Sequence, residues 1–292
     1  MRTRRMLIAG AIAAVLSVTA LTATATEATA ATGAAASTGP AGVKAPYAEV
    51  ANATTGAILW SQDPTAQVPM GSIAKVMTAY VVIESGNLNR LITVPKGITA
   101  YDKKYGASTA GLKPGEVLTA RQLLYAMLVP SGCDAAFTLA KAYGPGRTAF
   151  LAKMNATAAQ LGLAGTHFTD PAGLPDPTET STYSDAQDLV TLGRDAMQLP
   201  LFAKIVSLAG YTLPKVAGDH PAFTWTTTNP LIGVYPGTLG IKTGNTKAAK
   251  DCLLFEAEQN GEYVIGVVLG DKSWKKVTSD AETLLNYGFS NS

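Results

Sequence analysis

Histidine and cysteine, two residue types that often carry chemistry, are scarce in this sequence. Its 292 residues include two histidines, His167 and His220, and two cysteines, Cys133 and Cys252. The histidines are not placed as a metal hydrolase or a Ser-His-Asp enzyme would need, so we expect neither a metal nor another cofactor. The cysteines are too few for a disulfide framework, and two buried thiols are favoured over a pair.

Charged residues are also few, since Lys, Arg, Asp and Glu together make up 15% of the chain. The 23 basic and 21 acidic residues nearly cancel, and without the first 31 residues 20 of each remain. A protein so close to neutral lacks the basic surface that binds nucleic acids, so we expect no nucleic-acid partner. With 47% hydrophobic residues, the chain can form one large domain or two closely packed subdomains.

The N-terminal residues follow the pattern of a secretory signal peptide. Three arginines precede an apolar run from Met6 to Leu16, and small residues with Ala-x-Ala sites follow. Because this run is short for a membrane span, a retained anchor is the less favoured alternative. We expect residues 1–31 to be the signal peptide, 32–44 to be a low-complexity linker and 45–292 to form the folded domain outside the cytoplasm.

The stretch Met70–Glu84 is predicted to be a helix that is apolar on all its faces. Lys75 is the one charged residue inside it, and Ser72 lies three positions earlier on the same side. An amine removed from water loses its proton more readily and can then accept the proton of a hydroxyl. The pair is therefore a candidate nucleophile and base; the alternative is a lysine that reaches the surface and a serine that only caps the helix.

Strand patterns occupy both ends of the domain, and helical patterns occupy its middle. The predicted strands are 47–52, 57–62, 211–213, 238–243, 253–258 and 262–269, with a hairpin at Asn260-Gly261. Further predicted helices are 119–128, capped by Thr119, then 134–143, 147–161, 184–197, capped by Ser184, and 275–287. Residues 87–115 are predicted to be loop with short strands. This order indicates an α+β fold in which the first and last strands share one antiparallel sheet.

Two further short motifs accompany the serine and lysine of the central helix. Ser131 lies in the turn Val129–Asp134 between two predicted helices, where it is either held for catalysis or simply satisfies its own backbone. The third motif is Lys-Thr-Gly at 242–244, in a predicted strand. S-x-x-K, a serine turn like S-x-N, and K-T-G together are the set found in penicillin-binding proteins and class A β-lactamases.

From about Tyr47 to Phe289 the sequence resembles the low-molecular-weight D-alanyl-D-alanine carboxypeptidases, a family of penicillin-binding serine peptidases. The stretches that carry the resemblance are 75–80, 127–136, 168–174, 228–231, 235–246 and 284–289. The resemblance implies the serine β-lactamase/penicillin-binding-protein fold, with a five-stranded antiparallel sheet, packed helices and a mainly helical inserted subdomain. It also implies a monomeric, secreted cell-wall enzyme that acts on peptidoglycan stem peptides ending in D-Ala-D-Ala and is inhibited covalently by penicillin.

The resemblance assigns catalytic roles to three residues. Ser72 would attack the carbonyl carbon of the penultimate D-alanine and form an acyl-enzyme, releasing the terminal D-alanine. Lys75 would be the general base for this attack, and Ser131 would pass a proton toward the leaving nitrogen.

The resemblance places substrate binding on the strand that contains K-T-G. Lys242 and Thr243 would bind the terminal carboxylate of the substrate, a task that suits a cation beside a hydroxyl. The backbone N–H groups of Ser72 and Asn245 would form the oxyanion hole. Gly244 would leave room for the acyl chain to lie along the strand.

The sequence departs from the family pattern at two places. Cys133 stands where the family usually has asparagine, and sulfur is a much weaker hydrogen-bond partner than an amide. Because a Ser-Gly-Cys variant occurs in relatives that resemble DD-transpeptidases, transfer of the acyl group to an amine is the alternative to hydrolysis. Residues 170–173 read Asp-Pro-Ala-Gly where Asn-Pro-His-Gly is usual, a change that touches no assigned catalytic residue.

Two other functions are compatible with parts of the motif set. A β-lactamase needs a carboxylate base to activate the deacylating water, but between Thr166 and Ser184 there are only Glu179 and two aspartates, with no Glu-x-x-Leu-Asn pattern. A non-catalytic peptidoglycan-binding protein would explain the replacement at Cys133, although the otherwise complete motif set argues against it. The sequence therefore predicts a D-Ala-D-Ala carboxypeptidase first and a transpeptidase second.

Overall fold

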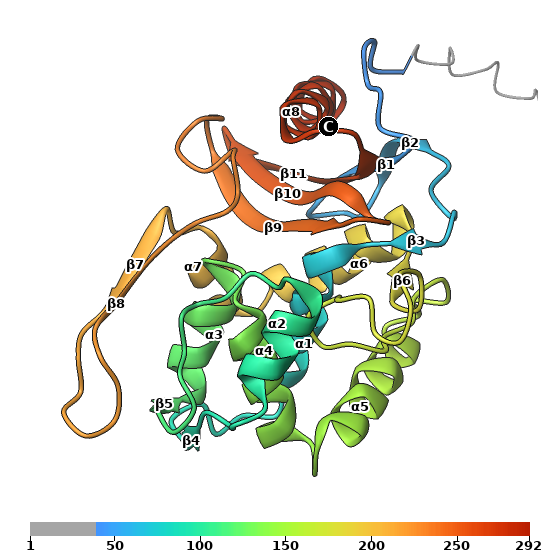
Figure 1. The fold of residues 1–292 in the computed structure, drawn as a ribbon. Helices are drawn as coiled ribbons and strands as arrows, with labels where there is room; N and C mark the ends of the chain where they lie inside the picture. Colours follow the sequence, from blue (N-terminus) through green and yellow to red (C-terminus); the bar gives the residue numbers. More distant parts are fainter. Residues whose placement is uncertain (1–38) are drawn as a thin grey trace, which may run out of the picture. The chain divides into compact units, whose positions relative to one another are not determined.

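The computed structural model describes residues 39–292, so the expected signal peptide and the first part of the expected linker lie outside the described residues. A five-stranded antiparallel sheet, in the order β2-β1-β11-β10-β9, joins both ends of the described chain (Figure 1). Its strands are β1 (Tyr47–Asn52), β2 (Ile58–Gln62), β9 (Thr238–Thr246), β10 (Lys250–Gln259) and β11 (Glu262–Asp271). The predicted α+β class and five-stranded sheet are thus confirmed.

The sheet is buried on both faces because its central strands are apolar on both sides. On β10, Leu253 and Phe255 belong to the core under helix α8 (Trp274–Asn291), whereas Leu254 belongs to the larger core on the other side. The turn between β10 and β11 is the predicted Asn260-Gly261 hairpin, and both residues have the positive φ that such a tight turn requires (55° and 85°).

Helices cover the other face of the sheet and form a mainly helical region beside it (Figure 1). These helices are η1 (Gly71–Ala74), α1 (Lys75–Glu84), α2 (Ile98–Tyr105), α3 (Ala120–Leu128), α4 (Cys133–Tyr143), α5 (Arg147–Gln160), α6 (Ala186–Met197) and α7 (Pro200–Val206). Two-stranded pairs complete the structure: β3 (Val68–Pro69) with β6 (Tyr183–Ser184), β4 (Leu91–Thr93) with β5 (Val117–Thr119), and β7 (Gly210–Leu213) with β8 (Phe223–Thr226). Among residues 39–292, none of the helices is both long and apolar enough to cross a bilayer.

Several local predictions need correction. The stretch Met70–Glu84 is not one α-helix, because a 3-10 turn, η1, precedes α1. Gly71 has a φ of 54°, and a side chain there would collide with the backbone nitrogen of Asn245 on β9, so the first turn is tightened where it meets the sheet. Ser184 does not cap α6 but pairs with Val68 in a short strand. The cap is Asp185, whose carboxylate accepts the N–H of Asp188 at 2.8 Å.

Two helices, α2 and α7, were not predicted at all. Helix α2 has only Ile98 and Tyr101 buried, and it lies in the polar segment that was predicted to be loop. Helix α7 has 7 residues and begins at Pro200. In contrast, the predicted cap of α3 is confirmed, since Thr119 and Gln122 form a capping box.

Candidate active site

A cavity of about 420 Å³ lies beside β9, the edge strand of the sheet. The segments that line it are η1, the end of α2 with the loop that follows, the turn between α3 and α4, the loop before β6, the loop after β8, β9 with the residue that follows it, and the first residue of α8. Its lining residues are Ser72, Tyr105, Gly106, Ala107, Ser108, Ser131, Cys133, Leu174, Pro175, Glu179, Thr228, Thr243, Gly244, Asn245, Thr246, Lys247 and Trp274. Six of the eight predicted site residues are in this set; Lys75 and Lys242 are buried directly behind it.

Lys75 connects the predicted catalytic residues. Its side chain is fully buried, and its Nζ lies 2.7 Å from the Oγ of Ser72, one helical turn earlier. The same Nζ lies 2.8 Å from the carbonyl oxygen and 3.3 Å from the Oγ of Ser131, and 3.1 Å from the Sγ of Cys133. The prediction that Lys75 is removed from water beside Ser72 is therefore confirmed, and the alternative in which it reaches the surface is wrong.

Ser131 owes its position to a strained turn between α3 and α4. Its φ is 64°, a left-handed conformation that is uncommon for residues other than glycine. The next residue, Gly132, packs so closely on the carbonyl of Ala126 in α3 that a side chain would not fit there. Ser108 donates a hydrogen bond to the carbonyl oxygen of Ser131 at 2.8 Å and so holds the turn from the cavity side. Such strain is typical of functional positions.

Strand β9 places the hydroxyl group of Thr243 at the surface of the cavity and the buried amine of Lys242 behind it. Thr243 lines the cavity, and its Oγ1 lies 2.6 Å from the Oγ1 of Thr228. Lys242 is buried behind it, with Nζ 3.0 Å from the carbonyl oxygen and 3.2 Å from the Oγ1 of Thr243. Burial, together with the positive charge of Lys75, holds the pKa of Lys242 well below its ordinary value.

Two glycines allow η1 to pack directly against β9. A side chain at Gly71 would strike the backbone nitrogen of Asn245, and one at Gly244 would strike the carbonyl oxygen of Met70. Gly244 therefore lacks a side chain for a packing reason as well as for the expected one, which was to leave space for an acyl chain. The contact brings the backbone that precedes Ser72 close to the backbone nitrogen of Asn245. The oxyanion hole expected from the N–H groups of these two residues stays a prediction.

Asp134 is a positioning residue that sequence analysis did not single out. Its buried carboxylate accepts hydrogen bonds from the N–H groups of Ala110, at 2.9 and 3.0 Å, and of Leu112, at 3.0 Å. These bonds fix the segment that carries Ser108 and Ala107 into the cavity wall. The available signal was an aspartate in the first turn of a helix, which predicts a cap but not its distant partners.

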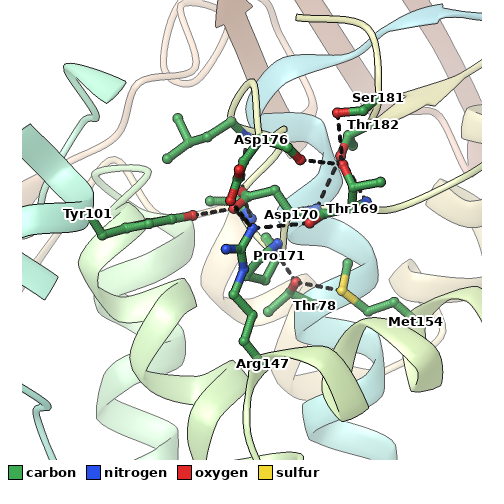
Figure 2. Close-up of polar contacts among 12 residues, drawn as sticks. Thr78, Tyr101, Arg147, Met154, Thr169, Asp170, Pro171, Asp176, Ser181 and Thr182 are labelled. Carbon is green, nitrogen blue, oxygen red and sulfur yellow. Dashed lines mark hydrogen bonds and ion pairs between the residues drawn. The ribbon is translucent and has the colours of Figure 1, made fainter. Parts of the chain in front are cut away.

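The loop of residues 170–182 forms another wall and is anchored by a buried carboxylate. Asp170 is fully buried, and its Oδ1 accepts the N–H groups of Ala172 and Leu174 at 2.8 and 3.0 Å. Its Oδ2 accepts hydrogen bonds from Tyr101 at 2.6 Å and from Arg147 at 3.0 Å, as Figure 2 shows. The predicted site did not include Asp170, because its importance depends on residues from α2 and α5.

Two further contacts fasten the same loop. Arg147 also pairs with Asp176 at 2.6 Å, and this hydrogen bond and charge, although burial opposes them, keep the pKa of Asp176 below its ordinary value. Thr78 of α1 donates a hydrogen bond to the carbonyl oxygen of Pro171 at 2.6 Å (Figure 2). The loop is therefore tied to α1, the helix that follows η1.

His167, His220 and Cys252 lie outside the cavity, whereas Cys133 is one of its lining residues. His167 bridges to Tyr183 through backbone bonds, and the ring of His220 packs near Phe223. Cys133 and Cys252 are both buried and unpaired, as predicted, and burial raises the pKa of Cys252 to about 12. Within residues 39–292, no group of three or more His, Cys, Asp or Glu side chains is arranged to hold a metal ion.

Comparison with known proteins gives consistent matches over most of the chain. The family model for D-alanyl-D-alanine carboxypeptidase, peptidase family S11, matches residues 34–273. A D-alanyl-D-alanine carboxypeptidase of Streptomyces sp. strain K15 is 38% identical over 249 residues, which cover 82% of this chain and 84% of the relative. The carboxypeptidase DacB2 of Mycobacterium tuberculosis is 35% identical over 243 residues, covering 82% of this chain and 80% of the relative.

Solved structures agree with these sequence matches. The crystal structure of the Streptomyces K15 DD-transpeptidase superposes with a TM-score of 0.81 at 37% identity, covering 85% of this chain and 98% of that one. A D-alanyl-D-alanine carboxypeptidase from Mycobacterium tuberculosis gives a TM-score of 0.77 at 34% identity, covering 86% of this chain and 95% of that one.

Proposed function

This chain belongs to the D-alanyl-D-alanine carboxypeptidase family of serine peptidases, and on that basis we propose that Ser72 is the nucleophile of its reaction. The family acts on peptidoglycan peptides that end in D-Ala-D-Ala, binds penicillin and works outside the cytoplasm at the cell wall. The enzyme is accordingly a serine-type D-Ala-D-Ala carboxypeptidase, a hydrolase. The observation that carries the role of Ser72 is its 2.7 Å contact with the buried amine of Lys75.

In the proposed acylation, neutral Lys75 takes the proton of Ser72 while the Oγ attacks the carbonyl carbon of the penultimate D-alanine. The carbonyl oxygen becomes negative, and the N–H groups of Ser72 and Asn245 stabilise it. Ser131, within 3.3 Å of Lys75, gives its hydroxyl proton to the nitrogen of the terminal D-alanine and receives in its place the proton that Lys75 took from Ser72. The C–N bond then breaks, D-alanine leaves and the peptide remains as an ester on Ser72.

In the proposed substrate complex, the terminal carboxylate binds at Thr243, with the charge of Lys242 behind it. A carboxylate favours the protonated form of Lys242, which compensates for the burial of that amine. Cys133 lines the cavity and contacts Lys75, and it does not offer the amide that the family usually has at this position. Water attack on the ester completes carboxypeptidation.

Acylation is tested by the intact mass of the purified protein after treatment with benzylpenicillin. We expect one stable penicilloyl adduct on the wild-type protein and none on Ser72→Ala. Ser207→Ala, an exposed serine outside the cavity, is the matched control and should be acylated normally. An adduct that persists on folded Ser72→Ala would refute the assignment of the nucleophile.

Transpeptidation is the second candidate, and two observations favour it. Cys133 replaces the usual asparagine, and a structure of 37% identity bears the name DD-transpeptidase. Incubating the enzyme with a D-Ala-D-Ala peptide, with and without a glycine-type amine, and counting hydrolysed and transferred products decides between the two. If transfer dominates at modest amine concentration, the order proposed here is wrong.

The remaining parts of the proposal concern processing and assembly. We propose that residues 1–31 are removed on secretion, that 32–44 form a linker and that 45–292 form the catalytic domain, with a retained N-terminal anchor as the alternative. We also propose that the enzyme is a monomer that uses no metal and binds no nucleic acid. N-terminal sequencing of the mature protein and its mass in solution test these points.

A further inference from the structure

A second cavity, of about 450 Å³, is lined by α6, α7, the turn after β1 and strands β9, β10 and β11. Its lining residues are a different set from those of the active-site cavity. On β9, Leu239 lines the second cavity and Thr243 lines the first, four residues apart and so roughly 13 Å along the strand. A volume of this size suits a small molecule. The second cavity is therefore a separate candidate site.

Glu256 of β10 is a carboxylate in the wall of this cavity that has no partner in the described part of the chain. The residue is only 5% exposed, and its side chain forms neither a hydrogen bond nor an ion pair with the described residues. Burial raises its pKa to about 7, although the charge of Arg194 opposes the shift. A buried carboxylate without a donor is unfavourable, so a cationic donor from a ligand would restore the stabilisation that burial removes.

Arg194 of α6 is the other charged side chain among the described residues of the lining. Its helix packs directly on the sheet, since a side chain at Gly193 would come within 2.9 Å of a side chain on β11. The Nε of Arg194 donates a hydrogen bond to the carbonyl oxygen of Ala53 at 2.9 Å, and its Nη2 donates one to that of Thr54 at 3.4 Å. An arginine has five N–H groups, so donors remain for a ligand. Arg194 lines the same cavity as Glu256 but forms no ion pair with it.

The two separated charges restrict the kind of ligand that fits. A cation alone would be repelled by Arg194, and an anion alone would be repelled by Glu256. The side chains of Met197, Ala203 and Leu239 supply apolar wall for the rest of a ligand. We propose that this cavity binds a free α-amino acid with an apolar side chain, its ammonium group on Glu256 and its carboxylate on Arg194. The inference is independent of the proposed reaction, because it uses none of the residues assigned to it.

The test measures binding of leucine to the full chain by isothermal titration calorimetry. The probes are L-leucine and D-leucine, with leucinamide, which lacks the carboxylate, and N-acetylleucine, which lacks the ammonium group. We expect one or both enantiomers of leucine to bind roughly tenfold or more tightly than the corresponding derivatives, because each derivative leaves one buried or half-buried charge without its partner. If neither enantiomer binds, or if both derivatives bind as tightly as leucine, the proposal is wrong.

Variants then locate the site. Glu256→Gln keeps the shape of the side chain and should bind leucine roughly tenfold more weakly, without preference over N-acetylleucine. Arg194→Gln should instead lose the preference over leucinamide. The matched controls, Glu84→Gln and Arg121→Gln at exposed positions, should bind as the wild type does. Thr243→Val, which alters the active-site cavity, should also leave the affinity for leucine unchanged. Unchanged affinity in Glu256→Gln would overturn the proposal, and so would loss of binding in Thr243→Val, which would place the amino acid in the active-site cavity.

Discussion

At Lys75, one buried amine meets four possible hydrogen-bond partners, although an ammonium group has three N–H bonds. The carbonyl oxygen of Ser131 also accepts a hydrogen bond from Ser108, so it remains satisfied when Lys75 loses a proton. The neutral amine can then accept the hydroxyl hydrogen of Ser72 without leaving a buried oxygen unpaired. The surroundings of Lys75 are therefore suited to both protonation states that a general base must adopt.

Replacing Lys75 by methionine should separate catalysis from folding. Methionine fills a similar volume but cannot accept the proton of Ser72, so we expect the second-order rate of acylation by benzylpenicillin to fall by roughly 10²–10⁴-fold. The thermal midpoint of unfolding should stay close to that of the wild type. The buried charge is removed together with its hydrogen bonds, so no unpaired charge is left in the core. Lys96→Met, at an exposed lysine, is the control and should acylate at the wild-type rate. Normal acylation of Lys75→Met would contradict its role as base.

The lowered pKa of Lys242 predicts that recognition of the terminal carboxylate of the substrate depends on pH. As pH rises through this lowered pKa, Lys242 becomes neutral in the free enzyme, so kcat/KM for a peptide with a terminal carboxylate should fall at a pH below the ordinary range of lysine. The corresponding peptide amide lacks the carboxylate and should not show this fall. The acylation chemistry at Ser72 is common to both substrates, so the difference between their two pH profiles isolates Lys242. Parallel profiles would contradict the assignment.

At the scale of elements, the 170–182 loop is held by α1, α2 and α5 together (Figure 2). Arg147 is central, since it pairs with Asp170 at 3.0 Å and with Asp176 at 2.6 Å. Asp170 is fully buried, and its negative charge is compensated by Arg147, whose side chain is 27% exposed. Loss of that charge leaves a buried carboxylate with only neutral donors.

Arg147→Met should loosen this loop more than it changes the rest of the fold. We expect the free energy of unfolding to fall by about 2 kcal/mol, less than for a fully buried pair because Tyr101 and two backbone N–H groups still bond Asp170. Hydrogen exchange should accelerate chiefly in residues 170–182. Arg121→Met, at an exposed arginine on α3, is the control and should alter neither quantity. If hydrogen exchange in residues 170–182 were unchanged, the backbone contacts of this loop would be sufficient to hold it without Arg147.

Elements with a strong local signal could be predicted from sequence, and those that depend on distant contacts could not. The capping box of α3 and the Asn260-Gly261 hairpin are encoded within a few residues, so both were predicted correctly. The break between η1 and α1 arises where Gly71 meets β9, a strand far along the chain. The same distinction holds in the site: S-x-x-K and K-T-G are short motifs, whereas Asp134 and Asp170 act through backbone groups of other segments.

At the scale of the whole described domain, the packing of helices on the sheet and on one another withdraws several carboxyl groups from water. Burial raises the pKa of Glu49, with help from Asp185 and Asp188, and of Glu256, each to about 7. Burial likewise raises the pKa of Asp102 and of Asp271, to about 6 in both cases. These groups bind protons more tightly in the folded state than in the unfolded state, which links them to the stability of the protein.

This linkage predicts that the protein is more stable near pH 5 than near pH 8. As pH rises from the unfolded pKa of 4.5 toward about 7, the unfolded chain loses the protons of Glu49 and Glu256 first, so folding becomes less favourable until both states are ionised. Each kcal/mol lost lowers Tm by roughly 2–4 °C in a domain of this size. Glu49→Gln and Glu256→Gln should each flatten the decline of Tm between about pH 5 and about pH 8 and raise Tm at the upper end, because a neutral amide carries no charge to bury. Glu262→Gln, at an exposed position, should leave the slope unchanged. A Tm that rises over this interval would mean that a buried base with a lowered pKa, such as Lys242, dominates the balance instead.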